Sequence, residues 1–509
     1  MVSQNKFQIT FKFYIFVDMS ANNYLIPNND SGMPDEYTVK QQLERFVEGF
    51  PFMDIVESAA VGNGIRKLDA ERIDSLGRAY DAAAEHLDIL KFVPASGAAT
   101  RMFADLYRCV DEGAESDTVR IVRDSLGAFA FYEALQRVCG NVADKPIPEV
   151  MSAIISPDGL DYGCLPKALI LFHRYGDTSR TPLEEHLVEG AQYARSGNTV
   201  RIHFTVSPQH IEGFSELLDS VLPVYSERYG VHYDIALSTQ RNSTDTVAVN
   251  PDNTPFREPD GSLLFRPAGH GALIQNLNDI NADIIFIKNI DNVTVDALRH
   301  DTVVYKKAMA GLLLEVRQQI FDWLQRLDDA EPEVVCGVVR FLQEILSVAL
   351  PESFDRLPDN DKITILRRLL DRPLRVCGMV RNQGEPGGGP FFVRDREGIV
   401  SLQIVEASQI APEYKHLMAS STHFNPVDVV CSVRDRFGAK YDLTKYVDPN
   451  TGFISQKTKN GRPLKALELP GLWNGAMSDW NTVFVEVPVT TFTPVKTVTD
   501  LLREGHRQP

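Results

Sequence analysis

Five short segments of this 509-residue chain combine small residues, cations and carboxylates in ways that suit phosphate chemistry. The first is a loop after the apolar run Leu87–Val93, and its residues of interest are Ser96, Gly97, Thr100 and Arg101. Small residues let backbone N–H groups approach a phosphate, and Arg101 would offer a cation to a departing pyrophosphate. The loop has no G-K-[ST] ending, so it is not a Walker loop. A turn needed only for packing is the alternative.

Two of the segments present a lysine. Lys167 follows Pro166 and precedes an apolar stretch, and Lys496 follows Val495 near the end of the chain. A lysine at a fixed position can neutralise the charge of reacting phosphates. The alternative in each case is a solvated surface lysine.

The remaining two segments hold a histidine between glycines and a carboxylate after an apolar strand. Gly269, His270 and Gly271 precede a predicted helix, where an exposed imidazole could donate to a phosphate or a sugar hydroxyl. Asn289 and Asp291 follow a very apolar run, and a carboxylate at a strand tip is a natural ligand for Mg²⁺. Turns that cap the following helices are the alternatives.

Taken in order along the chain, these segments resemble the UDP-sugar pyrophosphorylases, the UDP-glucose and UDP-N-acetylhexosamine branch of the nucleotide-diphosphosugar transferase superfamily. The G-G-x-G-T-R-[ML]-G loop of that family is kept in part, as Gly97, Thr100, Arg101 and Met102. The P-K, G-H-G, N-I-D-N and P-V-K-T-x-x-D-L-L elements of the family follow as Pro166–Lys167, Gly269–Gly271, Asn289–Asn292 and Pro494–Leu502. The chain is also similar to an uncharacterised bacterial family placed in this superfamily.

The resemblance implies a role for particular residues. Arg101, Lys167 and Lys496 would be catalytic cations, and Asp291 would hold magnesium. Nucleotide and sugar would be bound by Ser96, Gly97, Thr100, Gln240, Gly269, His270, Gly271, Asn289 and Asn425.

The implied activity joins a nucleoside triphosphate, UTP by resemblance, to a sugar 1-phosphate with release of pyrophosphate. The chain departs from the family where Pro94–Gly97 replaces the double glycine and Ala98–Ala99 removes a further loop glycine. A catalytically inactive sugar-nucleotide-binding or regulatory protein is therefore the alternative. A glycosyltransferase would need a D-x-D metal motif, and the only candidate considered, Asp359–Asp361, lies in a helical pattern.

Strand-like apolar runs alternate with helical periodicity along much of the chain. This predicts the α/β class, with a Rossmann-like, mostly parallel sheet flanked by helices. We expect strands at 87–94, 200–206, 282–287 and 483–487, and helices near 183–194, 211–222 and 272–280. Ligands of such sheets bind beyond the carboxyl ends of the strands, where most of the candidate segments lie.

The same pattern divides the chain into regions. We expect a loose N-terminal segment (1–35), a helical N-terminal region (36–86), a nucleotide-binding core (87–299) with an insertion at about 103–160, a helical insertion or cap (300–375) and the rest of the α/β domain with the Lys496 motif (376–509). The cap carries an apolar stripe made of Met309, Leu312, Leu313, Val316, Ile320 and Leu324.

Composition and charge narrow the functional classes. The formal charge of −17 opposes binding to nucleic acid or to an anionic membrane surface. The six cysteines are widely spaced without a C-x-x-C pair, which favours reduced cytosolic thiols. The apolar patch Phe11–Val17 is too short to span a bilayer, and Met19 could be the true initiator. We therefore expect a cytoplasmic protein without nucleic-acid or membrane partners.

Overall fold

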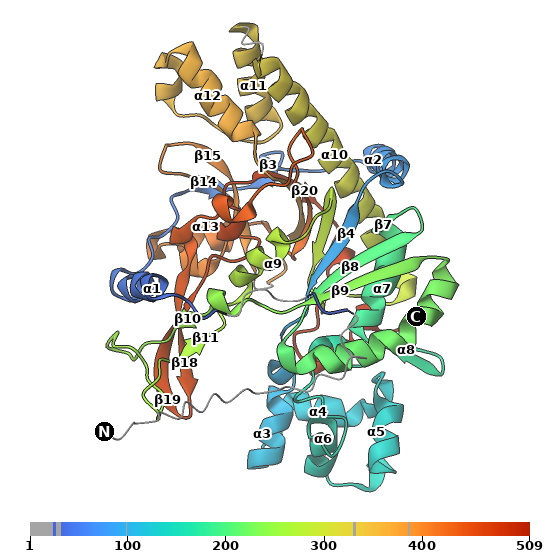
Figure 1. The fold of residues 1–509 in the computed structure, drawn as a ribbon. Coiled ribbons are helices and arrows are strands. Elements are labelled where there is room, and N and C mark those ends of the chain that lie inside the picture. The colour runs from blue at the N-terminus through green and yellow to red at the C-terminus, as the bar shows by residue number, and fades with distance from the viewer. Residues whose placement is uncertain (1–23, 27–31, 98, 329–331, 385–386, 509) are drawn as a thin grey trace, which may run out of the picture.

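The computed structural model describes residues 24–26, 32–97, 99–328, 332–384 and 387–508. It has the predicted α/β architecture, with a large, mostly parallel central sheet flanked by helices (Figure 1). The proposed initiator Met19 and most of the segment 1–35 lie outside the described residues. None of the described helices is both long and apolar enough to cross a membrane.

The central sheet has 11 strands, in the order β2-β3-β20-β13-β17-β12-β4-β8-β7, with β16 beside β13 and β9 beside β8. β17 is antiparallel to both of its neighbours, and β7 and β16 are antiparallel to their partners. The other pairs are parallel. The strands span Ala60–Val61 (β2), Gly64–Arg66 (β3), Asn481–Glu486 (β20), Leu374–Arg381 (β13), Asp428–Ser432 (β17), Ile284–Lys288 (β12), Ile89–Pro94 (β4), Thr199–Thr205 (β8), Arg195–Ser196 (β7), His423–Phe424 (β16) and His232–Ser238 (β9).

The four strands expected from the sequence are confirmed as β4, β8, β12 and β20. In register, Ile287 of β12 pairs with Phe92 of β4, and Phe92 pairs with His203 of β8. Because β4, β12, β13 and β20 run in the same direction, their carboxyl ends lie along one edge of the sheet. The antiparallel strand β17 begins at this carboxyl edge.

Helices cover the sheet. α2 (Ala70–Ala84) packs along α10 (His300–Asp328), and both contribute to the same core as β12 and β13. The predicted apolar stripe of α10 is buried in that core. The expected helices near 183–194 and 211–222 are confirmed as α7 (Pro182–Tyr193) and α8 (Ile211–Tyr229), which pack against β8 and β9. The third is shorter than expected, because a 3₁₀ turn precedes α9 (Ile274–Asn278).

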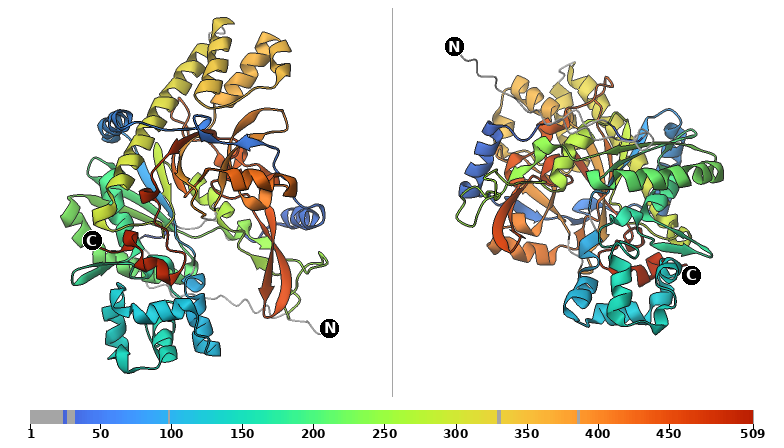
Figure 2. Two further views of the ribbon diagram at one scale, coloured as in Figure 1. Left: turned by 180° about the vertical axis from the view of Figure 1, so that it is seen from behind. Right: turned by 60° about the horizontal axis from the view of Figure 1, so that its bottom comes forward.

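Two groups of helices project from opposite ends of the molecule (Figures 1 and 2). One group follows the loop after β4 and shares its core with Val293 and with Val495, Val498 and Leu501 of the C-terminal segment; its members are α3 (Ala104–Glu112), α4 (Asp117–Asp124), α5 (Tyr132–Cys139) and α6 (Ile147–Ile155). The other group extends α10 and consists of α11 (Pro332–Glu344) and α12 (Asp359–Leu370). Asp359–Asp361 is thus the start of a helix and not the end of a strand, where a D-x-D metal motif would be expected.

The predicted helical N-terminal region (36–86) is not helical in its middle. Between α1 (Glu36–Glu48) and α2 lie three short strands: β1 (Ile55–Ser58), β2 and β3. β1 pairs with β14 (Gly389–Arg394), which pairs with β15 (Val400–Val405), and β3 pairs with β20. Pairing with strands far along the sequence overrides the local pattern here.

Several small elements complete the fold. Two-stranded pairs are formed by β5 (His173–Tyr175) with β6 (Thr178–Arg180), β10 (Thr246–Val247) with β11 (Phe265–Arg266), and β18 (Phe453–Lys459) with β19 (Arg462–Glu468). The short helix α13 (Lys415–Ser420) precedes β16.

Candidate functional site

A cavity of about 350 Å³ opens at the carboxyl edge of the sheet, and we call it the carboxyl-edge cavity. Four residues predicted from the sequence line it: Asn289, Asp291, Asn425 and Lys496. The first two follow β12, Asn425 lies between β16 and β17, and Lys496 lies in the segment after β20. The sheet topology therefore brings together candidates that are far apart in sequence.

Lys167 lies next to this cavity and contacts Asp291. It begins a 3₁₀ turn, and its Nζ donates to Asp291 Oδ2 at 2.6 Å and to the carbonyl of Val495 at 2.6 Å. The Lys167 and Asp291 side chains are only 17% and 13% exposed. Lys167 is thus not a solvated surface lysine. It ties Asp291 to the segment that carries Lys496.

The backbone around Lys496 is held in place, whereas its side chain is exposed. The backbone N–H of Lys496 donates to Asp500 Oδ2 at 2.8 Å, and that of Val495 donates to the carbonyl of Asp291 at 3.2 Å. Within the described part of the chain, the Lys496 ammonium makes no hydrogen bond or ion pair. Its charge is therefore available to a ligand in the cavity.

The loop after β4 lies beside the segments of both lysines. The N–H of Ala99 donates to the carbonyl of Leu165, and the carbonyl of Met102 accepts from the N–H of Val498. The carbonyl of Ser96 accepts from Ser207 Oγ at 2.9 Å.

Three predicted phosphate ligands of this loop, Gly97, Thr100 and Arg101, are exposed and lie outside the lining of the carboxyl-edge cavity. A Cβ at Gly97 would meet no atom within 4 Å, so packing does not require a glycine there. Of the two alanines that stand where the family loop has a further glycine, Ala99 is buried and Ala98 lies outside the described residues.

The two glycines beside His270 have a packing role. Gly269 has φ of +77°, and a Cβ there would lie 2.4 Å from Glu468 Oε2. A Cβ at Gly271 would lie 2.2 Å from the carbonyl oxygen of Pro470. Gly269 needs glycine because of its positive φ, and Gly271 needs it because a Cβ would meet the backbone of the segment after β19, whether or not the turn also binds a ligand.

His270 forms a ring stack with Trp473, which lines the carboxyl-edge cavity. The ring centroids are 4.2 Å apart and the planes differ by 4°. His270 Nδ1 accepts the N–H of Leu472 at 3.0 Å, and burial lowers the pKa of His270 to about 4 although 37% of the side chain stays exposed. Both observations indicate a neutral imidazole with its proton on Nε2, 3.9 Å from Glu406 Oε1.

The predicted contacts Asn425 and Gln240 are engaged within the protein. Asn425 is 4% exposed; its Nδ2 donates to the carbonyl of Gly378 at 2.9 Å, and its Oδ1 accepts from the N–H of Val427. Val427 has φ of +61°, so this amide supports a strained turn in the cavity wall. Gln240 follows β9, contacts Thr244 and lies outside the cavity lining.

Asp291 is the one predicted metal ligand. Among the described residues, no group of three or more His, Cys, Asp or Glu side chains could hold a metal by itself. Mg²⁺ commonly takes one or two carboxylates together with substrate phosphates and water, so a single carboxylate in a cavity fits such an ion only when a phosphorylated ligand is also bound.

Sequence reasoning missed Glu406 and Trp473, which face the predicted residues across the cavity. Burial raises the pKa of Glu406, while a hydrogen bond from Asn474 Nδ2 acts in the opposite direction. Neither residue belongs to a recognisable motif. Both lie far along the chain from most of the five segments, so the sequence did not indicate that they reach the cavity.

A buried charge network below the site was also missed. Glu189 of α7 accepts from Lys91 of β4 and from Lys288 of β12, both at 2.7 Å. Burial alone would raise the pKa of Glu189, but the two lysines hold it well below its usual range. Burial also lowers the pKa of Lys91 to about 7. A lysine inside each of two very apolar strands was the available signal.

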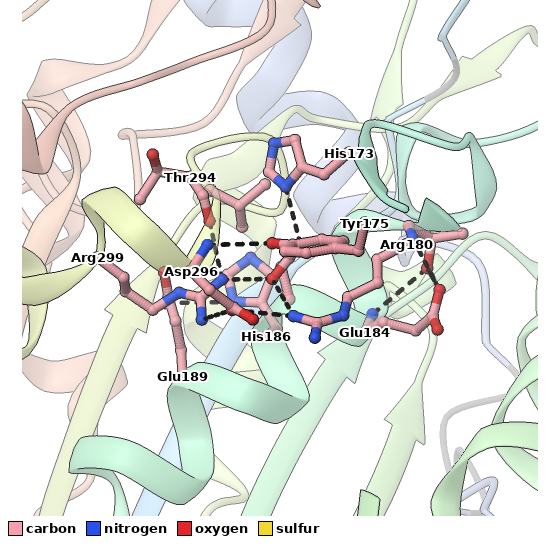
Figure 3. A network of polar contacts seen from close by, with 12 residues as sticks. His173, Tyr175, Arg180, Glu184, His186, Glu189, Thr294, Asp296 and Arg299 are labelled. Atoms are coloured by element: carbon pink, nitrogen blue, oxygen red, sulfur yellow. Dashed lines mark hydrogen bonds and ion pairs between the residues drawn. The ribbon is translucent and has the colours of Figure 1, made fainter. Parts of the chain in front are cut away.

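The network supports the segment that carries Asp291. His186 of α7 donates from Nε2 to the carbonyl of Ile290 at 3.2 Å, next to Asp291. Figure 3 shows this part of α7 together with Arg299 and the β5–β6 hairpin. There Glu185 accepts from Tyr175 at 2.8 Å and pairs with Arg299. We infer that these buried contacts fix the strand end at the cavity.

The fold places the chain in the α/β class, with a candidate site at the carboxyl edge of a mostly parallel sheet. The chain belongs to the family described as "Domain of unknown function (DUF4301)", which it matches over residues 28–507. No protein with a curated description matches the chain.

Solved structures of similar fold include two sugar-nucleotide enzymes. One is the uridine diphosphate N-acetylglucosamine pyrophosphorylase from Trypanosoma brucei in complex with inhibitor, at 13% identity and a TM-score of 0.47, covering 91% of this chain and 74% of that one. Another is a UDP-glucose pyrophosphorylase variant from Leishmania major in complex with UDP-glucose, at 12% identity and a TM-score of 0.41, covering 91% and 73%.

Proposed function

We propose that the protein is a nucleotidyltransferase that joins UTP to a sugar 1-phosphate and releases pyrophosphate. One observation carries the proposal: Asp291 and the Lys496 ammonium, which has no partner among the described residues, face one cavity at the carboxyl edge, with Lys167 bound to Asp291 beside it. Ligands of mostly parallel sheets bind at this edge. A carboxylate and two lysines in one place suit a triphosphate with its metal. The order of the five sequence motifs supports the same reaction.

In this reaction an oxygen of the sugar phosphate attacks the α-phosphorus of UTP, and the bond from that phosphorus to the pyrophosphate oxygen breaks. Asp291 would hold Mg²⁺, which when bound would neutralise charge on the triphosphate. Lys496 would stabilise charge on the reacting phosphates, and Arg101 would receive the departing pyrophosphate. The stack of His270 on Trp473 offers a flat surface for the base or the sugar.

The test is release of pyrophosphate from a panel of nucleoside triphosphates and sugar 1-phosphates, with Mg²⁺ and with EDTA in its place. The proposal expects turnover for at least one uridine pair, lost in EDTA and reduced on the order of 100- to 1,000-fold in Lys496→Met. Absence of turnover with every pair, together with UTP binding unchanged by Lys496→Met, would contradict it.

A second candidate is a sugar-nucleotide-binding protein without catalysis. It is favoured by the exposed loop residues Thr100 and Arg101, which lie outside the cavity lining, and by the engagement of Asp291 with Lys167. Calorimetry beside the turnover assay separates the two candidates. Tight UDP-sugar binding with no pyrophosphate release would support the binding protein.

A further inference from the structure

A second, larger cavity lies at the opposite edge of the sheet, where β13 and β20 begin. It has a volume of about 560 Å³, and we call it the amino-edge cavity. Arg372 precedes β13, Trp480 precedes β20, and Ile399 precedes β15, and all three line it. The carboxyl-edge cavity is lined instead by residues that follow β12 and β15. The two cavities are therefore separate and share the sheet between them.

The amino-edge cavity is lined by a cation, Arg372, and a carboxylate, Asp479, which attract each other but form no ion pair with each other or with the rest of the described chain. Arg372 donates from Nε to the carbonyl of Arg368 at 2.8 Å, but among the described residues its terminal nitrogens have no partner. Asp479 likewise makes no side-chain hydrogen bond or ion pair with the described chain. Burial lowers the pKa of Arg372 and raises that of Asp479, although Asp479 is exposed at the surface, and the attraction between the two groups opposes both shifts. By contrast, Arg394 in the same lining pairs with Asp54 at 3.5 Å.

Two further polar atoms of the lining are buried without a partner in the described structure. They are the indole Nε1 of Trp480, whose side chain is 4% exposed, and the hydroxyl of Ser478. Leaving such buried groups unpaired is unfavourable. Leu346, Val348 and Ile399 supply apolar surface in the same cavity.

We propose that the amino-edge cavity is a second binding site, for a small organic anion that carries a hydroxyl or an amine close to its charge. The anionic group, a carboxylate or a phosphate, pairs with Arg372. The neighbouring hydroxyl or amine donates to Asp479. The carbon skeleton covers the apolar wall. Amino acids and sugar phosphates share this chemistry.

A ligand there would also influence the carboxyl-edge cavity. Ser478 and Trp480 are joined to Trp473 and Asn474 by a single 3₁₀ turn, Gly475–Met477. Asn474 contacts Glu406, and the carbonyl of Ser478 accepts from Gln403 Nε2 at 2.7 Å, on the strand that leads to Glu406. A shift at Ser478 would therefore move both Trp473 and Glu406, which line the carboxyl-edge cavity. Only this regulatory effect rests on the proposed function; binding of the anion does not.

The test is calorimetry on the whole protein with glucose 6-phosphate, with glutamate and with neutral glucose. We expect one of the two anions to bind, glucose to fail, and the bound anion to stay in place when UTP and Mg²⁺ are added. Arg372→Met should weaken binding about tenfold or more, and Asp479→Asn should weaken it less. Arg356→Met, which removes an exposed arginine outside the cavity, is the matched control.

Binding of neither anion, or equal binding by the Arg372→Met and Arg356→Met variants, would overturn the site. Displacement of the bound anion by UTP would contradict the claim that the anion binds outside the carboxyl-edge cavity. With an active substrate pair, the anion should change the rate of pyrophosphate release in the parent and not in Arg372→Met. An unchanged rate in the parent would overturn the regulatory role alone, and absence of turnover with all substrates would count against the proposed function instead.

Discussion

Replacement of Lys496 by methionine should separate catalysis from stability. The Lys496 ammonium has no partner among the described residues, and its backbone is held by Asp500 and not by its own side chain. Loss of an exposed, unpaired side chain usually changes the free energy of unfolding by no more than about 0.5 kcal/mol. Loss of one preorganised charge at a reacting phosphate costs about 2.7–4 kcal/mol of transition-state stabilisation, or about 100- to 1,000-fold in kcat.

Pyrophosphate release and thermal unfolding, measured on the same preparations, test this separation. Lys496→Met should melt within a degree or two of the parent and should turn over on the order of 100- to 1,000-fold more slowly. Lys307→Met serves as the control, because Lys307 is a lysine of α10 that pairs with Asp81 away from the cavity. It should leave turnover unchanged.

The reasoning would be refuted if Lys496→Met retained turnover within twofold of the Lys307→Met control. A large fall in melting temperature would refute a different step, because it would mean that Lys496 stabilises the fold through a contact that the structure does not show.

Four other substitutions follow from the site and the core. Lys167→Met removes two 2.6 Å hydrogen bonds, one of them to Asp291. It should lower turnover, and in denaturant titration it should lower the free energy of unfolding by about 2–4 kcal/mol. An unchanged free energy of unfolding would contradict the pairing of Lys167 with Asp291. Gly97→Ala should keep the parent stability but weaken UTP binding. Gly271→Ala should unfold more easily, because a Cβ there would meet neighbouring backbone atoms. Equal effects of the two variants on the melting temperature would contradict this packing role of Gly271. Burial lowers the pKa of His203 to about 4, below its value in the unfolded chain. The stability that the neutral His203 side chain gives the fold is therefore complete above about pH 6.5 and declines as pH falls toward 4, by as much as about 3 kcal/mol. His203→Gln should reduce this acid sensitivity in urea titrations, and an unchanged pH dependence would contradict it.

The sequence predicted the fold class well because the central strands are long apolar runs. β4, β8, β12 and β20 appear within two residues of the expected limits. The strands β1 to β3 could not be predicted, since they are short and are stabilised by pairing with β14 and β20, hundreds of residues away. Their local pattern of apolar residues between two helices gave no sign of that pairing.

For the site, residues at strand ends were predictable and residues on distant loops were not. Asn289 and Asp291 follow an apolar strand, so their place at the carboxyl edge followed from the fold. Glu406 follows β15, a strand that the sequence did not predict, and Trp473 reaches the same cavity from the irregular segment after β19. The helix α7 shows most clearly what the sequence could not predict. Its residues Glu185, His186 and Glu189 suggest a solvated face, yet all three are buried. The two glutamates can be buried because Lys91 pairs with Glu189 and Arg299 pairs with Glu185.

A crystal structure of the protein with UTP and Mg²⁺ tests the central claim most directly. The account predicts that the triphosphate occupies the carboxyl-edge cavity, with Lys496 Nζ on a phosphate oxygen and the metal on Asp291. Nucleotide bound elsewhere, or an empty cavity at a UTP concentration that saturates binding in solution, would contradict it.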